Sequence, residues 1–162
     1  MTLCSTSDSK EWATFFQSYG PYELFGSLTF PEMIDAISAH NATREFFTRF
    51  CRNDHGSHIR LALAWELQQR GVSHYHFMAR SIGPQKSQAN SIDPRALKDF
   101  WQGWTKGNAK IMAYNPTLGG EGYLAHHQHK GIVTLCPRTP SCRRDESCRY
   151  DASGCFWPGY DD

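Results

Sequence analysis

The sequence predicts an α+β fold, because segments with the period of a strand alternate with segments with the period of a helix along its 162 residues. Residues 58–80 form two apolar runs joined by a polar turn, which is typical of a β-hairpin. A strand-like segment at residues 22–30 and a helix-like segment at residues 31–50 precede the hairpin. A helix starting at residue 93 and a strand at residues 108–114 follow it.

The helices have recognisable start signals. Pro31 suits the first turn of the first helix, which we expect to run to about Phe50, because proline lacks the N–H that a first turn leaves unbonded. Asp93 and Pro94 form a similar start for the second helix, with the aspartate as its cap. A further helix is expected at residues 121–130, after a loop that contains proline and glycine.

In chain order these elements are strand, helix, two hairpin strands, helix, strand and a further helix. This is the split β-α-β arrangement of ferredoxin-like folds. We expect the helices to cover one face of the sheet and to leave the other face available. Residues 1–131 are predicted to form this domain, and residues 132–162 a cysteine-rich C-terminal extension.

The turn of the hairpin decides where Glu66 points relative to His74 and His76, which share one face of their strand. A two-residue turn would pair Glu66 with Tyr75 and aim the carboxylate away from both histidines. A three-residue loop would pair Glu66 with His74 and bring all three side chains to one face. That loop commonly needs a left-handed residue at its third position, where Gly71 stands, so we favour it.

Glu66, His74 and His76 in this register predict a divalent-metal site with free coordination positions, because two imidazoles and a carboxylate meet on a partly open face. The small residues Ala62 and Ala64 would lie nearby and leave room for the ion. The competing interpretation is an incidental pair of histidines, which is the usual explanation of a His-x-His sequence taken alone. The position of Glu66 favours the metal site.

A second group of polar side chains lies on the predicted helix at residues 121–130. Tyr123, His126, His127 and Lys130 have the spacing i, i+3, i+4, i+7 and therefore share one helix face. The face could simply be solvated. A tyrosine phenol is a poor nucleophile at its ordinary pKa near 10, but a cation on the same face and a metal that polarises the electrophile would both help. Phosphate is the electrophile that suits this combination.

Composition sets limits on the class of protein. Charged residues make up 20% and aromatic residues 14% of the chain, which indicates a globular fold. The net charge of +1 neither predicts nor excludes nucleic-acid binding, which needs only a local basic patch. There is no long apolar run and no signal-peptide pattern at the N-terminus, so we expect a cytoplasmic protein without a membrane partner.

Four of the six cysteines lie in the C-terminal segment, at Cys136, Cys142, Cys148 and Cys155. Their intervals of five, five and six residues differ from the two-residue spacing of strong zinc motifs. Two interpretations remain open: a structural Zn²⁺ site that holds these thiols, or a set of free intracellular thiols.

Three ordered motifs resemble the HUH endonucleases, specifically the rolling-circle replication initiators of plasmids and phages. Leu28-Thr29-Phe30 resembles the first motif, and Glu66 with His74-Tyr75-His76 resembles the metal motif. The third match, residues 109–125, resembles the approach to the catalytic tyrosine. Together the matches span about residues 22–131.

This resemblance implies a metal-dependent enzyme that nicks single-stranded DNA at a replication origin and transfers the strand, with Tyr123 as nucleophile. Mg²⁺ or Mn²⁺ would be the metal in the cell, and the ligands would also accept Zn²⁺, Co²⁺ or Ni²⁺. A host helicase would unwind the DNA. A transposase or conjugative relaxase of the same superfamily, or a nucleic-acid-binding relative without chemistry, is the alternative.

The family usually has Tyr-x-x-Lys at the catalytic tyrosine, whereas this chain has His126 in place of the lysine. Either His126 or Lys130, one turn further along the predicted helix, would supply the cation. We favour Lys130 slightly, because it lies at i+7 from Tyr123 and so on the same helix face.

Overall fold

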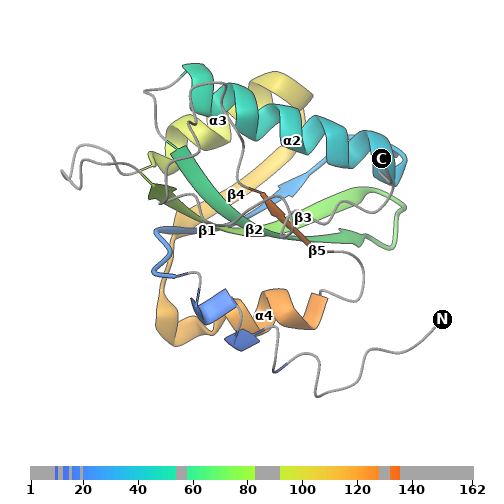
Figure 1. The fold of residues 1–162 in the computed structure, drawn as a ribbon. Coiled ribbons are helices and arrows are strands. Elements are labelled where there is room, and N and C mark those ends of the chain that lie inside the picture. Colours follow the sequence, from blue (N-terminus) through green and yellow to red (C-terminus); the bar gives the residue numbers. More distant parts are fainter. Residues whose placement is uncertain are drawn as a thin grey trace, which may run out of the picture.

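The computed structural model describes residues 10, 13–14, 16–18, 20–53, 58–82, 92–127 and 132–135. It confirms an α+β fold built on an antiparallel sheet with strand order β4-β1-β3-β2-β5 (Figure 1). The elements in chain order are β1 (Leu24–Thr29), α2 (Ala36–Asn53), β2 (His58–Leu67), β3 (Ser73–Ile82), α3 (Pro94–Thr105), β4 (Asn108–Ala113), the short 3-10 helix η2 (Pro116–Leu118), α4 (Gly120–His127) and β5 (Ile132–Leu135).

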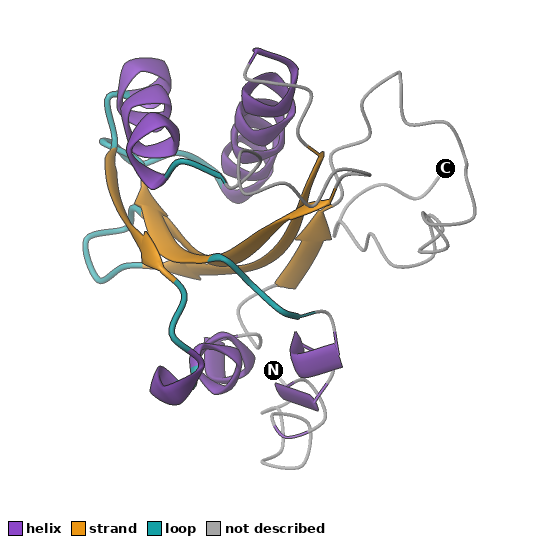
Figure 2. Cartoon of the chain, turned by 90° about the vertical axis from the view of Figure 1, so that its left-hand side faces the viewer, coloured by secondary structure: helices purple, strands orange, loops and turns teal. Residues whose placement is uncertain are grey.

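The main core lies between the sheet and the helices α2 and α3, which both cover the same face (Figure 2). Aromatic rings fill this layer and meet mostly edge to face, the arrangement that ring quadrupoles favour. Phe46 of α2 contacts Trp101 of α3 at a centroid distance of 4.9 Å, and Trp101 contacts Phe30 at 5.1 Å. This layer of aromatic side chains supports one face of the sheet, and the candidate site lies on the opposite face.

The sequence predicted that the opposite face of the sheet would be open. In the structure, α4 and helical residues among 10–18 cover part of this face (Figure 2). Leu124 and Ala125 of α4 are buried in a second apolar cluster, which also contains Ala62 and Ala64 of β2. The two strand alanines are short, so the helix can approach the sheet closely. The predicted open face is therefore wrong for the part of the sheet beneath α4.

The first long helix begins later than predicted. It starts at Ala36 rather than in the turn at Pro31, because Asp35 provides a better cap. The Asp35 carboxylate accepts a hydrogen bond of 2.9 Å from the backbone N–H of Ser38. Hydrogen bonds from the Ser38 side chain and then from its backbone lower the pKa of Asp35. The cap predicted for α3 is confirmed: the Asp93 carboxylate accepts from the Arg95 N–H at 2.8 Å.

The hairpin register is the one that a three-residue loop predicts. Glu66 pairs with His74, and Ala64 pairs with His76. The Gln68 N–H donates to the Val72 carbonyl at 3.0 Å, which closes the strand pair just before the loop. Gly71 has a φ of 76°, the left-handed conformation that this loop position needs. The turn thus determines that the carboxylate and the imidazoles share one face.

One strand was not predicted. Residues Ile132–Leu135 form β5, which pairs antiparallel with β2 at the sheet edge opposite β4. The strand begins directly after residue 131, where the sequence suggested that the first domain ends. Lys130 and the four C-terminal cysteines lie outside the described residues.

In the part of the chain that the structure describes, no helix combines the length and the apolar character needed to cross a bilayer.

We expect Gly71→Ala to lower the free energy of unfolding by about 1–2 kcal/mol, because alanine meets a steric penalty in the left-handed region. The added Cβ would also lie 2.9 Å from the Met33 sulfur, but that side chain is exposed and can move away. Urea unfolding measures the change. Gly71→Asn is the matched variant and should cost less, since asparagine tolerates this conformation. Equal stability of the alanine variant and the wild type would contradict the assigned turn.

Candidate functional site

The candidate site lies on the sheet face beneath α4 and is organised in rows that run across the strands. Thr29 of β1 pairs with His74 of β3, and His74 pairs in turn with Glu66 of β2. In the next row, Ser27 of β1 pairs with His76 of β3. Because side chains alternate along a strand, residues two positions apart share a face, and these rows lie side by side.

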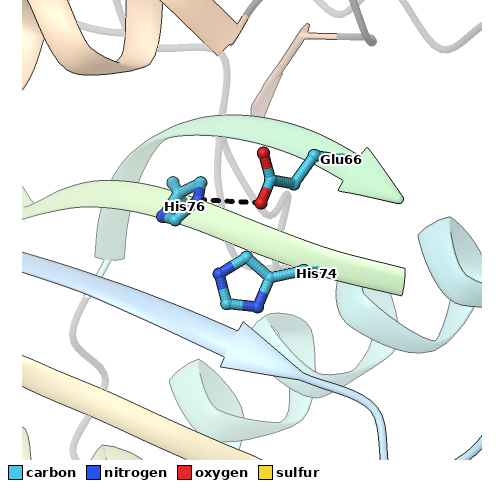
Figure 3. A group of neighbouring side chains, drawn as sticks. All are labelled: Glu66, His74 and His76. Atoms are coloured by element: carbon cyan, nitrogen blue, oxygen red, sulfur yellow. Dashed lines mark ion pairs between the residues drawn. The ribbon is translucent and has the colours of Figure 1, made fainter. Parts of the chain in front are cut away.

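Glu66, His74 and His76 converge on this face (Figure 3). One ligand atom from each residue lies within 4.8 Å of the other two. The His76 Nε2 atom is 3.6 Å from the Glu66 Oε1 atom, and the two imidazole centroids are 4.5 Å apart. Both histidines are buried, with 8% and 7% of their surfaces exposed, so the ligand atoms are held in a partly dry setting.

These three side chains fit a divalent metal ion. Nitrogen and oxygen ligands lie about 2.0–2.2 Å from such ions, so two ligands on opposite sides of one ion are about 4.2 Å apart. The observed spread of 4.8 Å exceeds this span only slightly, and a small side-chain rotation closes the difference. Three protein ligands leave coordination positions for water or a substrate. We call Glu66, His74 and His76 the triad.

Thr29 orients one ligand of the triad. Its hydroxyl oxygen lies 2.6 Å from the Nδ1 atom of His74, and both side chains are buried. When Nδ1–H donates to this oxygen, the Nε2 atom of His74 keeps its lone pair for a metal. This role of Thr29 was not predicted from the sequence. The available signal was its position at the end of the first strand, because the split arrangement predicted from the sequence places that strand beside the histidine strand.

A close backbone contact fixes Thr29 itself. Gly107 lies just before β4, and a Cβ atom at this position would lie 2.1 Å from the Thr29 carbonyl oxygen. The same atom would lie 2.9 Å from the Thr105 hydroxyl oxygen, at the end of α3. No side chain fits there. The end of α3 is thus packed directly against the strand end that orients His74.

Tyr123 of α4 lies against the triad. Its hydroxyl oxygen is 3.3 Å from the His76 Nε2 atom, and the two rings meet edge to face with centroids 4.8 Å apart. The Phe25 ring supports the phenol from a centroid distance of 5.9 Å. Tyr123 keeps 43% of its surface exposed, so part of the residue is open to a substrate. Burial raises the pKa of Tyr123, and the Glu66 carboxylate raises it further.

The loop before α4 determines where Tyr123 stands. Gly119 has a φ of 65°, and its carbonyl accepts a hydrogen bond of 3.0 Å from the Tyr123 N–H. Gly120 packs so tightly that an added Cβ would lie 3.0 Å from the Tyr114 ring and 3.2 Å from the Phe25 ring. The helix can therefore begin directly against β1 and the end of β4.

The structure brings together four of the residues predicted for the site: Glu66, His74, His76 and Tyr123. His126 belongs to α4, but its side chain is not among those described. Lys130 lies beyond the described part of the helix, so the choice between these two residues stays a prediction.

Comparison with known proteins gives no relative. The chain matches no protein-family model, no curated protein and no solved structure. Its function must therefore be argued from the chemistry of the triad and Tyr123.

Proposed function

We propose that the protein is a metal-dependent endonuclease and strand transferase that acts on single-stranded DNA, with Tyr123 as the nucleophile. The observation that carries this proposal is the Tyr123 hydroxyl, 3.3 Å from the Nε2 atom of a histidine in the triad. A partly exposed phenol beside a metal-binding group is the arrangement that phosphoryl transfer to tyrosine needs.

In the proposed reaction, the Tyr123 oxygen forms a bond to a backbone phosphorus, and the bond from that phosphorus to the 3′ oxygen breaks. The phenol proton leaves to solvent, and the 3′ oxygen takes up a proton to become a hydroxyl. The product is a covalent 5′-phosphotyrosine. One phosphodiester replaces another, so a 3′-hydroxyl can reverse the reaction and rejoin strands without ATP.

A bound divalent ion would polarise the non-bridging phosphate oxygens and orient the phosphate for in-line attack. Glu66, His74 and His76 would hold it, with Thr29 fixing the orientation of His74. Mg²⁺ or Mn²⁺ suits phosphate chemistry, although the nitrogen ligands also favour later transition metals.

The contact between Tyr123 and His76 suggests how binding of a metal ion would affect the proposed nucleophile. When Nδ1 of neutral His76 carries the proton, its Nε2 atom has a single lone pair, which cannot accept the Tyr123 proton and bind a cation at once. Coordination through this nitrogen would release the phenol hydroxyl for a substrate. A cation bound to Glu66 would also offset the negative charge of its carboxylate, which is one of the two causes that raise the pKa of Tyr123.

The strand order supports the finer fold assignment. Four strands in the order β4-β1-β3-β2, connected as strand, helix, two strands, helix and strand, follow the split β-α-β plan of ferredoxin-like folds. We include this plan in the proposal, together with membership of the HUH endonucleases that three sequence motifs resemble. Rolling-circle replication initiation is the role that this resemblance favours, with origin DNA as partner.

The test uses the full chain, Mn²⁺ and a pool of random single-stranded DNA. We expect a protein–DNA adduct that survives denaturation, forms with Mn²⁺ and does not form with EDTA. Mass spectrometry of the digested adduct should place the nucleotide on Tyr123. A double-stranded pool is the matched control and should give far less adduct. Attachment to another residue would contradict the assigned nucleophile.

The runner-up is a nucleic-acid-binding relative without chemistry. The raised pKa of Tyr123 favours this alternative, because the phenol resists ionisation. Binding of the DNA pool without any adduct, at all Mn²⁺ concentrations, would support it. Transposases and conjugative relaxases share the nicking chemistry, so the DNA sequences enriched in the adduct, rather than the adduct itself, distinguish them.

A further inference from the structure

A lysine lies on the site face of the sheet at the β4 edge. Lys110 pairs with Ser27 of β1, and Ser27 pairs with His76 of β3. The three residues therefore form one row across the sheet, with Lys110 exposed at its end. Neighbouring strands are about 4.8 Å apart, so the backbones of Lys110 and His76 are separated by roughly 10 Å. A long lysine side chain and one phosphate group can bridge that separation.

A cavity lies beside this row, on the side of Tyr123. Its volume is about 180 Å³, and its walls are mostly apolar. Pockets for drug-sized ligands measure about 300–1,000 Å³, so this smaller cavity suits a smaller, flat group such as one nucleobase. The side chains that line the cavity include Phe25, Met112, Tyr114, Leu118 and Tyr123.

The cavity and the lysine are adjacent in the fold. Phe25 pairs with Met112, two positions along β1 and β4 from the pair of Ser27 and Lys110 and so on the same sheet face. Tyr123 lines the cavity and also contacts His76, at the far end of the lysine row. The Glu121 carboxylate lies at the cavity wall, where it accepts a hydrogen bond from the Tyr114 hydroxyl.

We propose that Lys110 and this cavity bind one nucleotide of the single strand, next to the phosphate that Tyr123 attacks. The Lys110 ammonium pairs with a backbone phosphate, and the cavity takes the attached base between the Phe25, Tyr114 and Leu118 side chains. This inference rests on the proposed function for its substrate. A purely apolar ligand would not use the lysine, whereas a nucleotide combines an anion with a flat ring. Bases bind sequence-tolerantly to aromatic side chains in this way.

The first test measures binding without cleavage. Fluorescence anisotropy with labelled oligothymidine in EDTA gives the affinity at several salt concentrations. We expect Lys110→Gln to weaken binding about fivefold and to reduce the salt slope by about 0.7, the loss of one phosphate contact on a single strand. Lys98→Gln is the matched control, because Lys98 is an exposed lysine of α3, the helix on the other face of the sheet. It should bind oligothymidine nearly as the wild type does.

The second test addresses the base. Wild-type protein should bind oligothymidine more tightly than an abasic oligonucleotide of equal length. Leu118→Ala removes one wall of the cavity at an exposed position, so the fold should tolerate it. We expect this variant to lose roughly threefold in affinity for oligothymidine and little for the abasic strand, as removal of one side of a base contact should.

The results separate this inference from the proposed function. Wild-type affinities and salt slopes in both Lys110→Gln and Leu118→Ala would overturn the inference, even if the Tyr123 adduct forms. Loss of binding in these variants without any adduct from the wild type would keep the nucleotide site and overturn the nuclease. Failure of the wild type to bind oligothymidine would overturn the nucleotide site alone, because the adduct assay with Mn²⁺ and random DNA tests the nuclease separately.

Discussion

The Tyr123→Phe variant is expected to form no denaturation-resistant DNA adduct, a loss of roughly 10⁴–10⁶-fold in rate, because it lacks the attacking oxygen. The change removes one atom and keeps the ring. The contacts with Phe25 and His76 should remain, so the position of α4 should not change. Metal binding should stay intact, since the phenol is not one of the triad ligands. Denaturing gels with labelled single-stranded DNA and Mn²⁺ measure the adduct.

Tyr22→Phe is the matched control for this variant. The Tyr22 hydroxyl donates a hydrogen bond of 2.9 Å to the Phe16 carbonyl in the same apolar cluster as Leu124 of α4. Its loss should lower stability by about 1 kcal/mol and leave the adduct in place. An adduct of normal yield in Tyr123→Phe would show that another residue is the nucleophile.

The double variant His74→Ala with His76→Ala is expected to lower the Mn²⁺ affinity by more than about 100-fold, because it removes two of the three side chains of the triad. Thr29→Val should weaken binding by roughly 10–100-fold, the usual cost of removing the group that orients a ligating histidine. Calorimetric titration with Mn²⁺ measures both effects. A smaller loss of Mn²⁺ affinity in Thr29→Val than in the double variant would support both the ligand role of the histidines and the orienting hydrogen bond between Thr29 and His74.

Thermal unfolding provides the control for folding. Mn²⁺ should raise the melting temperature of the wild type, because a ligand that binds only the native state stabilises it. The double variant should show no such rise, whereas Glu45→Gln, on the surface of α2, should respond as the wild type does. Equal Mn²⁺ affinity in the wild type and the double variant would rule out the triad as the metal site.

The triad could be predicted from sequence because local rules determine it. Alternation along β3 puts His74 and His76 on one face, and Gly71 selects the loop that brings Glu66 opposite His74. These rules involve residues close in the chain. The cap at Asp93 was predictable for the same reason.

The start of α2 was predicted wrongly because two start signals stand close together in the sequence. Pro31 suits a first helical turn, since its missing N–H costs nothing there. The Asp35 carboxylate, however, accepts a hydrogen bond from the Ser38 N–H, which satisfies a donor that the first turn would otherwise leave unbonded. This bond favours the later start at Ala36.

The position of α4 could not be predicted from its own residues. It depends on Leu124 and Ala125 meeting Ala62 and Ala64 of a strand far away in the sequence. The strand β5 was missed for a similar reason, because its four residues gain their partner only from the edge of β2. Such contacts become visible only when the whole sheet is assembled.

The lack of space for a side chain at Gly107 limits which substitutions this sequence can accept during evolution. A single methyl group there would collide with the Thr29 carbonyl, and Thr29 orients His74. A substitution at position 107 would therefore disturb the residue that orients His74, although Gly107 has no side chain and lies outside the triad. In distant relatives, a glycine directly before β4 and a threonine at the end of β1 should be inherited as a pair.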